Sequence, residues 1–174
     1  VINKANATVT GNSATVTYTG ANQTTSGFTA SGLVGGETEA VLTGVSASRT
    51  AKNAGSYAVT PSGTDSNYNL SFVDGSMRIN KAALTATGNS TSVTYNGANQ
   101  TVSGFTVSGL QGSDTVASLS SVVASGATGK NAGSYTNTVT AGTETNYTVS
   151  TVNGGLTIAK ANATVTANSG TLTY

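Results

Sequence analysis

Short runs in which apolar and polar residues alternate recur along the whole chain. In residues 7–10 Ala and Val alternate with Thr, and in residues 14–18 Ala, Val and Tyr do the same. Alternation with a period of two is typical of β-strands that bury one face. Gly11-Asn12 lies between the two runs and is a turn signal. The pattern therefore predicts a β-hairpin over residues 7–18.

The alternating pattern continues at equivalent positions further along the chain. Leu84 and Ala86 correspond to Ala7 and Val9, and Ala163 and Val165 keep the same register. Further short strands are expected near 26–33, 39–46, 56–61, 67–73 and 76–81. Strands this short, with a turn about every ten residues, favour an all-β fold of small β-sandwiches, immunoglobulin-like or related.

The chain is a tandem repeat. Residues 2–5, Ile-Asn-Lys-Ala, return at 79–82 and as Ile-Ala-Lys-Ala at 158–161, and the block Lys-Asn-Ala-Gly-Ser-Tyr occurs at 52–57 and 130–135. A period this long without helix signals indicates an array of small domains. We expect one repeat over 1–80, a second over 81–159 and the start of a third over 160–174. In the alternative phase a unit begins at Tyr18 and ends at Tyr95.

Each repeat carries about a dozen candidate core residues, which is few for its length. A domain of this size buries only about 60–65% of the surface of its unfolded chain, so a thin core is expected. The candidates in the first repeat are Val9, Val16, Phe28, Leu33, Val41, Leu42, Tyr57, Val59, Tyr68, Leu70, Met77 and Ile79.

The segments that join the repeats are not typical of flexible linkers. Residues 77–84 and 156–163 contain neither Gly nor Pro, whereas flexible linkers are rich in Gly and Ser. The sequence predicts that one strand leads directly into the next. We expect successive domains to be joined nearly end to end with restricted bending, which would give an elongated rod.

Composition narrows the function. The chain has 33 Thr, 22 Ser and 22 Gly but only seven basic and six acidic residues, for a net charge of +1. So weak a field would attract neither nucleic acid nor an anionic membrane. No apolar run approaches the ~20 residues that a membrane-spanning helix needs. Neither nucleic-acid binding nor membrane insertion by this segment is expected.

The residues that usually carry catalysis or bind metals are scarce. The chain has no His and no Cys, and the six acids form no convincing pair, so we expect no catalytic residue, no cofactor site and no enzymatic activity. Asp65-Ser66-Asn67 and Glu144-Thr145-Asn146 each supply one acid to a loop and are interpreted as turns rather than calcium sites. Glu37, Glu39 and Asp114 lie in the middle of their repeats, and Glu37 has only a loose counterpart in the second repeat.

The tyrosines occupy equivalent sites in the repeats. The sets are 18, 95 and 174; 57 and 135; and 68 and 147. We interpret them as core residues, with stacking on sugars as the alternative. Lys52 and Lys130 are interpreted as part of a structural block, with a binding role as the alternative. Lys4, Lys81 and Lys160 are expected to screen a strand edge or to interact across the domain junction.

The repeated motifs together resemble a known family. Val-Thr-Tyr-[Thr/Asn]-Gly, Ser-Gly-Phe, Lys-Asn-Ala-Gly-Ser-Tyr, Asn-Tyr and a closing Ile-x-Lys-Ala are similar to the glycine-rich, mostly-β repeats called MBG or YDG domains. Residues 18–20 and 95–97 lie where that family often has Tyr-Asp-Gly, without the acid. The resemblance implies a surface-exposed stalk in an exported, extracellular bacterial adhesin, and it provides no catalytic residues.

Three functions remain open. In the first, the repeats form a stalk or spacer that projects a distal binding region from the cell surface. In the second, they are weak modules that bind glycans or matrix polysaccharide through avidity. In the third, neighbouring copies associate with one another in biofilm through exposed strand edges. A continuous β-helix is a structural alternative, but its rungs of ~20 residues are not visible within the repeat.

Overall fold

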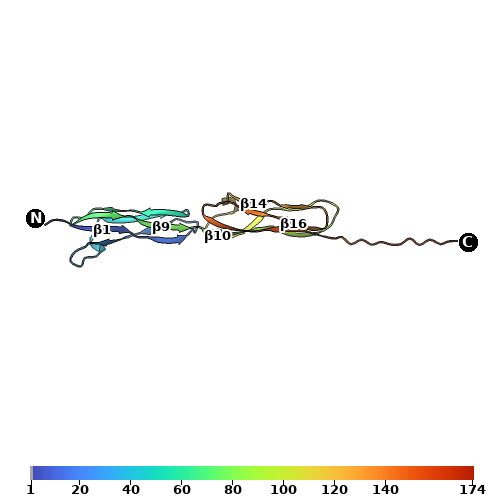
Figure 1. Ribbon diagram of the computed structural model, residues 1–174, viewed down its shortest axis with the longest axis horizontal. Coiled ribbons are helices and arrows are strands. Elements are labelled where there is room, and N and C mark those ends of the chain that lie inside the picture. The colour runs from blue at the N-terminus through green and yellow to red at the C-terminus, as the bar shows by residue number, and fades with distance from the viewer. Residues whose placement is uncertain (1) are drawn as a thin grey trace. The chain divides into compact units, whose positions relative to one another are not determined.

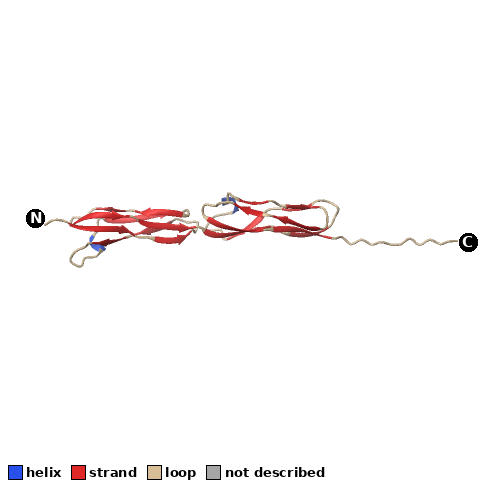
Figure 2. Cartoon of the chain, viewed as in Figure 1, coloured by secondary structure: helices blue, strands red, loops and turns tan. Residues whose placement is uncertain are grey.

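The computed structural model of the chain describes residues 2–174. They contain nineteen strands and two short 3-10 turns (Figure 2). The predicted all-β class is confirmed. No helix in this part of the chain is long and apolar enough to cross a membrane. The chain divides into two compact units, of which the first comprises 1–84, 108–120 and 143–150, and the second comprises 85–107, 121–142 and 151–174.

The first repeat forms three three-stranded sheets (Figure 1). Their orders are β4–β1–β8, β2–β9–β6 and β3–β5–β7. The strands are β1 (Ala5–Gly11), β2 (Ala14–Thr17), β3 (Gln23–Ser26), β4 (Phe28–Ser31), β5 (Val45–Ala51), β6 (Gly55–Val59), β7 (Pro61–Gly63), β8 (Tyr68–Val73) and β9 (Gly75–Asn80), with the 3-10 turn η1 at Glu39–Val41.

The second repeat has the same order of elements with one difference. The counterpart of β5 is divided into β14 and β15, and Ser125-Gly126 lies between them. The sheets are β13–β10–β18 and β11–β19–β16, with the pairs β12–β15 and β14–β17. The strands are β10 (Ala82–Gly88), β11 (Thr91–Thr94), β12 (Gln100–Val102), β13 (Phe105–Ser108), β14 (Val122–Ala124), β15 (Ala127–Gly129), β16 (Gly133–Asn137), β17 (Val139–Ala141), β18 (Tyr147–Val152) and β19 (Gly154–Ala159), with η2 at Val116–Ser118.

The predicted hairpin over residues 7–18 is wrong. β1 and β2 do not pair with each other, since β1 pairs in parallel with β8 and β2 pairs in parallel with β9. A two-residue reversal would need positive φ angles, which no non-glycine residue described here adopts. Instead Asn12 donates through Nδ2 to the carbonyl of Ser26 at 3.1 Å, and Ser13 Oγ accepts the N–H of Ser76 at 2.9 Å. The chain thus passes from one sheet into the next.

Two glycines allow this change of sheet. A Cβ at Gly11 would lie 2.1 Å from the carbonyl oxygen of Val59, and one at Gly75 would lie 2.2 Å from the carbonyl oxygen of Gly11. Real Cβ contacts essentially never come this close, so the backbones meet at a distance that only glycine permits.

Two other expected strands are absent. The strand expected over residues 39–46 is replaced by the 3-10 turn η1, and β5 begins only at Val45. Val41, a predicted core residue, is therefore 39% exposed, whereas Leu42 is buried. Residues 160–174 also contain no strand, and Val165 is 94% exposed. In the first repeat the equivalent strand β1 is held by β4 and β8, which lie further along the repeat. The fifteen residues of the third copy in this sequence do not reach those partners.

The core of the first repeat is as small as its length predicts. One cluster packs Val9, Leu42, Val45 and Tyr68 together with Ala7. Of the twelve candidates, six are buried and five are half-buried, and Val41 is exposed. The buried ones are Val9, Leu42, Val59, Tyr68, Met77 and Ile79; the half-buried ones are Val16, Phe28, Leu33, Tyr57 and Leu70.

We predict that Gly75→Ala destabilises the first repeat. The added methyl group meets backbone oxygens of Gly11 and Asn12 at 2.2 and 2.3 Å, so two strands must move apart, at a cost of about 1–3 kcal/mol. Denaturant unfolding of the whole chain measures the loss. Gly170→Ala is the matched control, because its Cβ has no heavy atom within 4 Å. Equal midpoints for the two variants would contradict the sheet crossing.

Candidate functional site

The same tyrosine–carboxylate contact occurs in both repeats. Tyr68, at the start of β8, donates its hydroxyl to the carboxylate of Glu37 and accepts the N–H of Val34 at 3.0 Å. In the second repeat Tyr147, at the start of β18, donates to Asp114 Oδ2 at 2.6 Å. Both tyrosine side chains are at least 95% buried.

Glu37 and Asp114 are therefore structural equivalents. We expected Glu37 to have only a loose counterpart, although residues 31–38 and 108–115 share Ser-Gly-Leu, a glycine two residues before the acid and a threonine directly after it. The backbone contact of the tyrosine is also the same in both repeats, since Tyr147 Oη accepts the N–H of Gln111 at 2.9 Å as Tyr68 Oη accepts that of Val34. A spacing of 77 residues, which Tyr18 and Tyr95 also show, is the signal that identifies this pair in the sequence.

In the first compact unit a third residue joins this contact. Tyr18 donates its hydroxyl to Asp114 Oδ2 at 2.9 Å. Its ring meets that of Tyr147 edge to face, with centroids 5.5 Å apart and planes at 82°, an arrangement that aromatic pairs prefer. Only 2% of Tyr18 is exposed. Tyr18, Asp114 and Tyr147 are called the tyrosine clamp below.

Two glycines allow the backbones beside the clamp to approach. Gly20 has φ of +76° and Gly112 has φ of +57°. A Cβ at Gly20 would lie 2.7 Å from the carbonyl oxygen of Gln111, and one at Gly112 would lie 3.0 Å from that of Thr19. The glycine two residues after Tyr18 thus serves both the turn and the close contact.

Asparagines extend the same contact surface. The N–H of Ala54 donates to Asn146 Oδ1 at 2.9 Å, and Asn146 Nδ2 donates to Asn53 Oδ1 at 3.2 Å. Asn53 belongs to the repeated Lys-Asn-Ala-Gly-Ser-Tyr block, whose tyrosine closes its own loop, since Tyr57 donates to the Asn53 carbonyl at 2.8 Å. The block thus contacts the loop of the second repeat that carries Asn146, within this compact unit.

The clamp holds its groups in fixed protonation states. The hydrogen bond from Tyr147 lowers the pKa of Asp114, and the bond from Tyr18 and the nearby charge of Lys52 lower it further against the effect of burial. Burial, followed by the hydrogen bond to Asp114, raises the pKa of Tyr147 to about 12 and also raises that of Tyr18. At neutral pH the carboxylate is charged and both phenols are protonated. The clamp therefore holds two protonated hydroxyls on one charged carboxylate.

The lysines between the repeats act within their own repeats. Lys4 donates to the carbonyl of Asp65 at 2.8 Å, and Lys81 donates to that of Glu144 at 2.6 Å. The prediction of an interaction across the junction is wrong for these two ammonium groups, because each donates to a carbonyl of its own repeat. That they screen a strand edge stays a prediction. Lys160 lies in the segment without strands.

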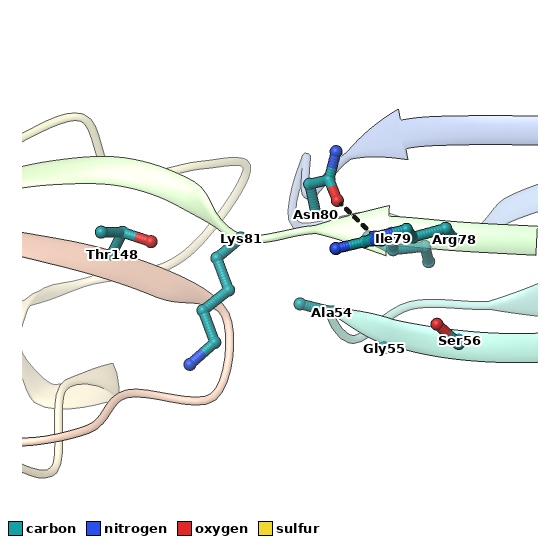
Figure 3. A pocket seen from close by; sticks show the side chains of 8 residues that line it. All are labelled: Ala54, Gly55, Ser56, Arg78, Ile79, Asn80, Lys81 and Thr148. Atoms are coloured by element: carbon teal, nitrogen blue, oxygen red, sulfur yellow. Dashed lines mark hydrogen bonds between the residues drawn. The ribbon is translucent and has the colours of Figure 1, made fainter.

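The predicted direct connection of strands is confirmed between the repeats. β9 ends at Asn80 and β10 begins at Ala82, so that Lys81 alone separates them. An open depression of about 620 Å³ lies here (Figure 3). It is lined by residues 54–56, 78–81 and Thr148, and Arg78 Nε donates to Asn80 Oδ1 at 3.0 Å. Its lining contains no carboxylate.

The two acid-containing triplets form turns. Asp65 Oδ1 accepts the N–H groups of Asn67 and Tyr68 at 2.7 and 3.1 Å. Glu144 is 95% buried, and its Oε2 accepts a hydrogen bond from Ser120 Oγ at 3.2 Å. Within residues 2–174 no group of three or more acids, His or Cys is placed to hold a metal ion. The carboxylates act here as acceptors for backbone and hydroxyl donors.

The remaining tyrosines differ in exposure. Tyr57 and Tyr135 are half-buried. Tyr95 is 40% exposed, and Tyr174 lies fully exposed in the last segment. The interpretation of the tyrosines as core residues thus describes Tyr18, Tyr68 and Tyr147 and does not describe Tyr95 or Tyr174.

Comparison with known proteins identifies both repeats. The family model described as the MBG domain (YGX type) matches residues 7–78 and again residues 84–157. Neither the curated proteins nor the solved structures gave a match to the chain.

We predict that Asp114 makes stability depend on pH. Its pKa is lower in the folded chain than in the unfolded chain, so its contribution is present above the unfolded value and is lost as the pH falls through the folded value. The difference in unfolding free energy between the natural chain and Asp114→Asn should therefore be constant above the unfolded pKa of the aspartate and shrink as the pH falls below it. Chemical unfolding at several pH values measures it, and a difference that does not shrink would contradict the ionised clamp.

We also predict unequal losses for two tyrosine hydroxyls. Tyr147→Phe leaves the partly buried N–H of Gln111 without its acceptor and removes a donor to Asp114, which should cost about 1–3 kcal/mol. Tyr135→Phe removes only an exposed bond to the Asn131 carbonyl and should cost about 0.5 kcal/mol. Thermal unfolding of the two variants makes the comparison. Equal losses would show that the Tyr147 hydroxyl has no special role.

Proposed function

The chain belongs to the MBG domain family (YGX type), and from this we propose that its repeats form the stalk of an exported bacterial surface adhesin. MBG domains are structural, non-enzymatic repeats typical of surface proteins. The observation that carries the proposal is the tandem arrangement, in which one residue, Lys81, separates the last strand of one repeat from the first strand of the next. A spacer needs such a connection, because a long flexible linker would not hold the distal region at a defined distance.

The strands give an estimate of how far one repeat reaches. β1 and β2 follow one another over residues 5–17, and each is paired in parallel with one of the consecutive strands β8 and β9. At ~3.3 Å per residue these thirteen residues span roughly 40 Å. Adding copies would then move a distal binding region outward by a similar step each time.

The surface chemistry supports a spacer as well. Outward-facing positions on the strands are mostly Thr and Ser, and few charged residues occur in the chain. Such a surface stays hydrated without a strong field that would attract unrelated molecules. A weak electrostatic field suits a segment whose role is to hold a distance.

A second candidate function is glycan binding, which the exposure of Tyr95 favours. This side chain is 40% exposed and, with Lys160 and Ala132, lines an open hollow of about 410 Å³. An aromatic face beside a lysine can stack on a sugar ring and donate to its hydroxyl groups.

The stalk proposal predicts that the number of repeats sets the height of the distal region above the cell, without any ligand bound by the repeats. Cells displaying an epitope above two or four copies of the repeat should place that epitope at heights differing by roughly 80 Å, since each added copy contributes roughly 40 Å. Super-resolution localisation of the epitope relative to the membrane measures the height. An unchanged height would contradict the stalk.

Binding of the chain to an array of glycans and bacterial polysaccharides, with and without a calcium chelator, separates the two candidates. A stalk gives no saturable binding at high protein concentration. Saturable binding that Tyr95→Ala abolishes would establish the glycan-binding module instead.

A further inference from the structure

Tyr95 occupies the same backbone position in the second repeat as Tyr18 in the first. The N–H of Tyr18 donates to the Asn80 carbonyl at 2.9 Å, and that of Tyr95 donates to the Ala159 carbonyl at 2.8 Å. The glycine two residues later also keeps its conformation, with φ of +80° at Gly97. In each repeat the same Tyr-x-Gly turn, which follows the second strand, is therefore fixed to the end of the last strand.

The surroundings of the two turns differ sharply. Tyr18 is 2% exposed in the clamp, whereas Tyr95 is 40% exposed. A Cβ at Gly20 would meet backbone atoms at 2.7 Å, whereas one at Gly97 would meet no heavy atom within 4 Å. Among the described residues, the turn of the second repeat therefore has the same glycine conformation, but no backbone lies against Gly97 as Gln111 lies against Gly20.

The first repeat carries the opposite half of the same contact. Glu37 and Tyr68 are paired as Asp114 and Tyr147 are, and Gly35 keeps a φ of +66° as the counterpart of Gly112. A Cβ at Gly35 would meet no heavy atom within 4 Å. A hollow of about 360 Å³ lies over this half, lined by Val34, Glu37, Tyr68 and residues 2–5 and 66–67.

We propose that these two ends are docking surfaces for a further MBG repeat of the same chain, so that the tyrosine of each repeat enters the tyrosine–carboxylate pair of the next. The inserted ring packs edge to face on the resident tyrosine and donates its hydroxyl to the carboxylate. A carboxylate has about four acceptor positions, and the one in Asp114 accepts two hydroxyls at once. Glu37 is also a carboxylate, so it can accept a second hydroxyl beside that of Tyr68.

A repeat of the same chain fits better than a separate molecule. The clamp that is filled in this structure joins Tyr18 to the sequence-adjacent repeat, whose first strand follows after Lys81 alone. So short a connection gives the tyrosine a high effective concentration at its site. The proposal concerns the joint between repeats and holds whether or not the array acts as a stalk.

The first experiment extends the chain by one repeat. Residues 1–160 are followed by a second copy of residues 82–159, in which the copied tyrosine carries Tyr95→Phe so that Tyr95 stays unique. Nitration by tetranitromethane, mapped by mass spectrometry, reports how accessible each tyrosine is. The reactivity of Tyr95 should fall about tenfold or more relative to the 174-residue chain, as for a joint that is closed in most molecules. Unchanged reactivity of Tyr95 would overturn the proposal.

Two controls make the result specific. Replacing the aspartate of the added copy that corresponds to Asp114 (Asp114→Ala) should restore the reactivity of Tyr95, while Tyr57, which lies outside the new joint, should react equally in all chains. In the 174-residue chain itself, Asp114→Ala should raise the reactivity of Tyr18 toward that of Tyr95 without changing the far-ultraviolet circular dichroism spectrum. Protection that survives the aspartate replacement would mean that the tyrosine is covered by some other contact.

Sedimentation of the 174-residue chain tests the choice of partner. Docking to a repeat of the same chain predicts a monomer at micromolar concentration. A dimer that Tyr95→Ala dissociates would show that the ends join separate molecules, and would overturn the assignment to the same chain.

Discussion

A carboxylate that accepts the hydroxyl of a buried tyrosine is the interaction on which the ends of these repeats depend. Tyr68 and Tyr147 are at least 95% buried, and each would lose hydrogen bonds with water on folding. Glu37 and Asp114 replace that water, and hydrogen bonds to a charged acceptor are stronger than neutral ones. Each hydroxyl also accepts a backbone N–H from the loop after β4 or β13. The pair therefore fixes a loop that the thin core could not hold by packing alone.

The sheets impose a second constraint, because their pairings join distant parts of each repeat. β1 pairs with β8 over residues 5–10 and 68–73, almost the full length of the repeat. Such non-local pairing slows folding, since a long loop must close before the contacts form. The crossing at Gly11 and Gly75 brings two backbones together at a point where a side chain would prevent them from meeting. With a small core, this backbone complementarity carries much of the specificity of the fold.

Composition, alternation and repetition were sufficient to predict the all-β class, the repeated motifs and the direct passage from β9 into β10. They did not predict the sheet order, because Gly11-Asn12 is equally compatible with a reversal and with a change of sheet. The choice depends on β8 and β9, which lie more than fifty residues away in the sequence. The 3-10 turn at Glu39–Val41 was missed for a similar reason, since burial of Leu42 and not alternation determines the local conformation.

The candidate site was harder to predict, because no single residue in it indicates a site and only the contacts between them do. Glu37 and Asp114 differ in residue type, and Glu37 has a second acid, Glu39, two residues away where the other copy has Val116. Their common role follows from geometry, which places each one against a tyrosine 31 or 33 residues away.

Contact between successive repeats changes how an array responds to stress. Repeats that only share a covalent connection unfold independently, whereas repeats that share an interface unfold with a nearest-neighbour coupling. Tyr18 contributes to such a coupling, because unfolding of its own repeat would remove a donor from Asp114 and a ring from Tyr147. The same coupling limits sequence divergence, since a change in the Tyr-x-Gly turn of one copy must be accepted by the loop that receives it. Core residues of different copies can vary separately, but the residues of the clamp must vary together.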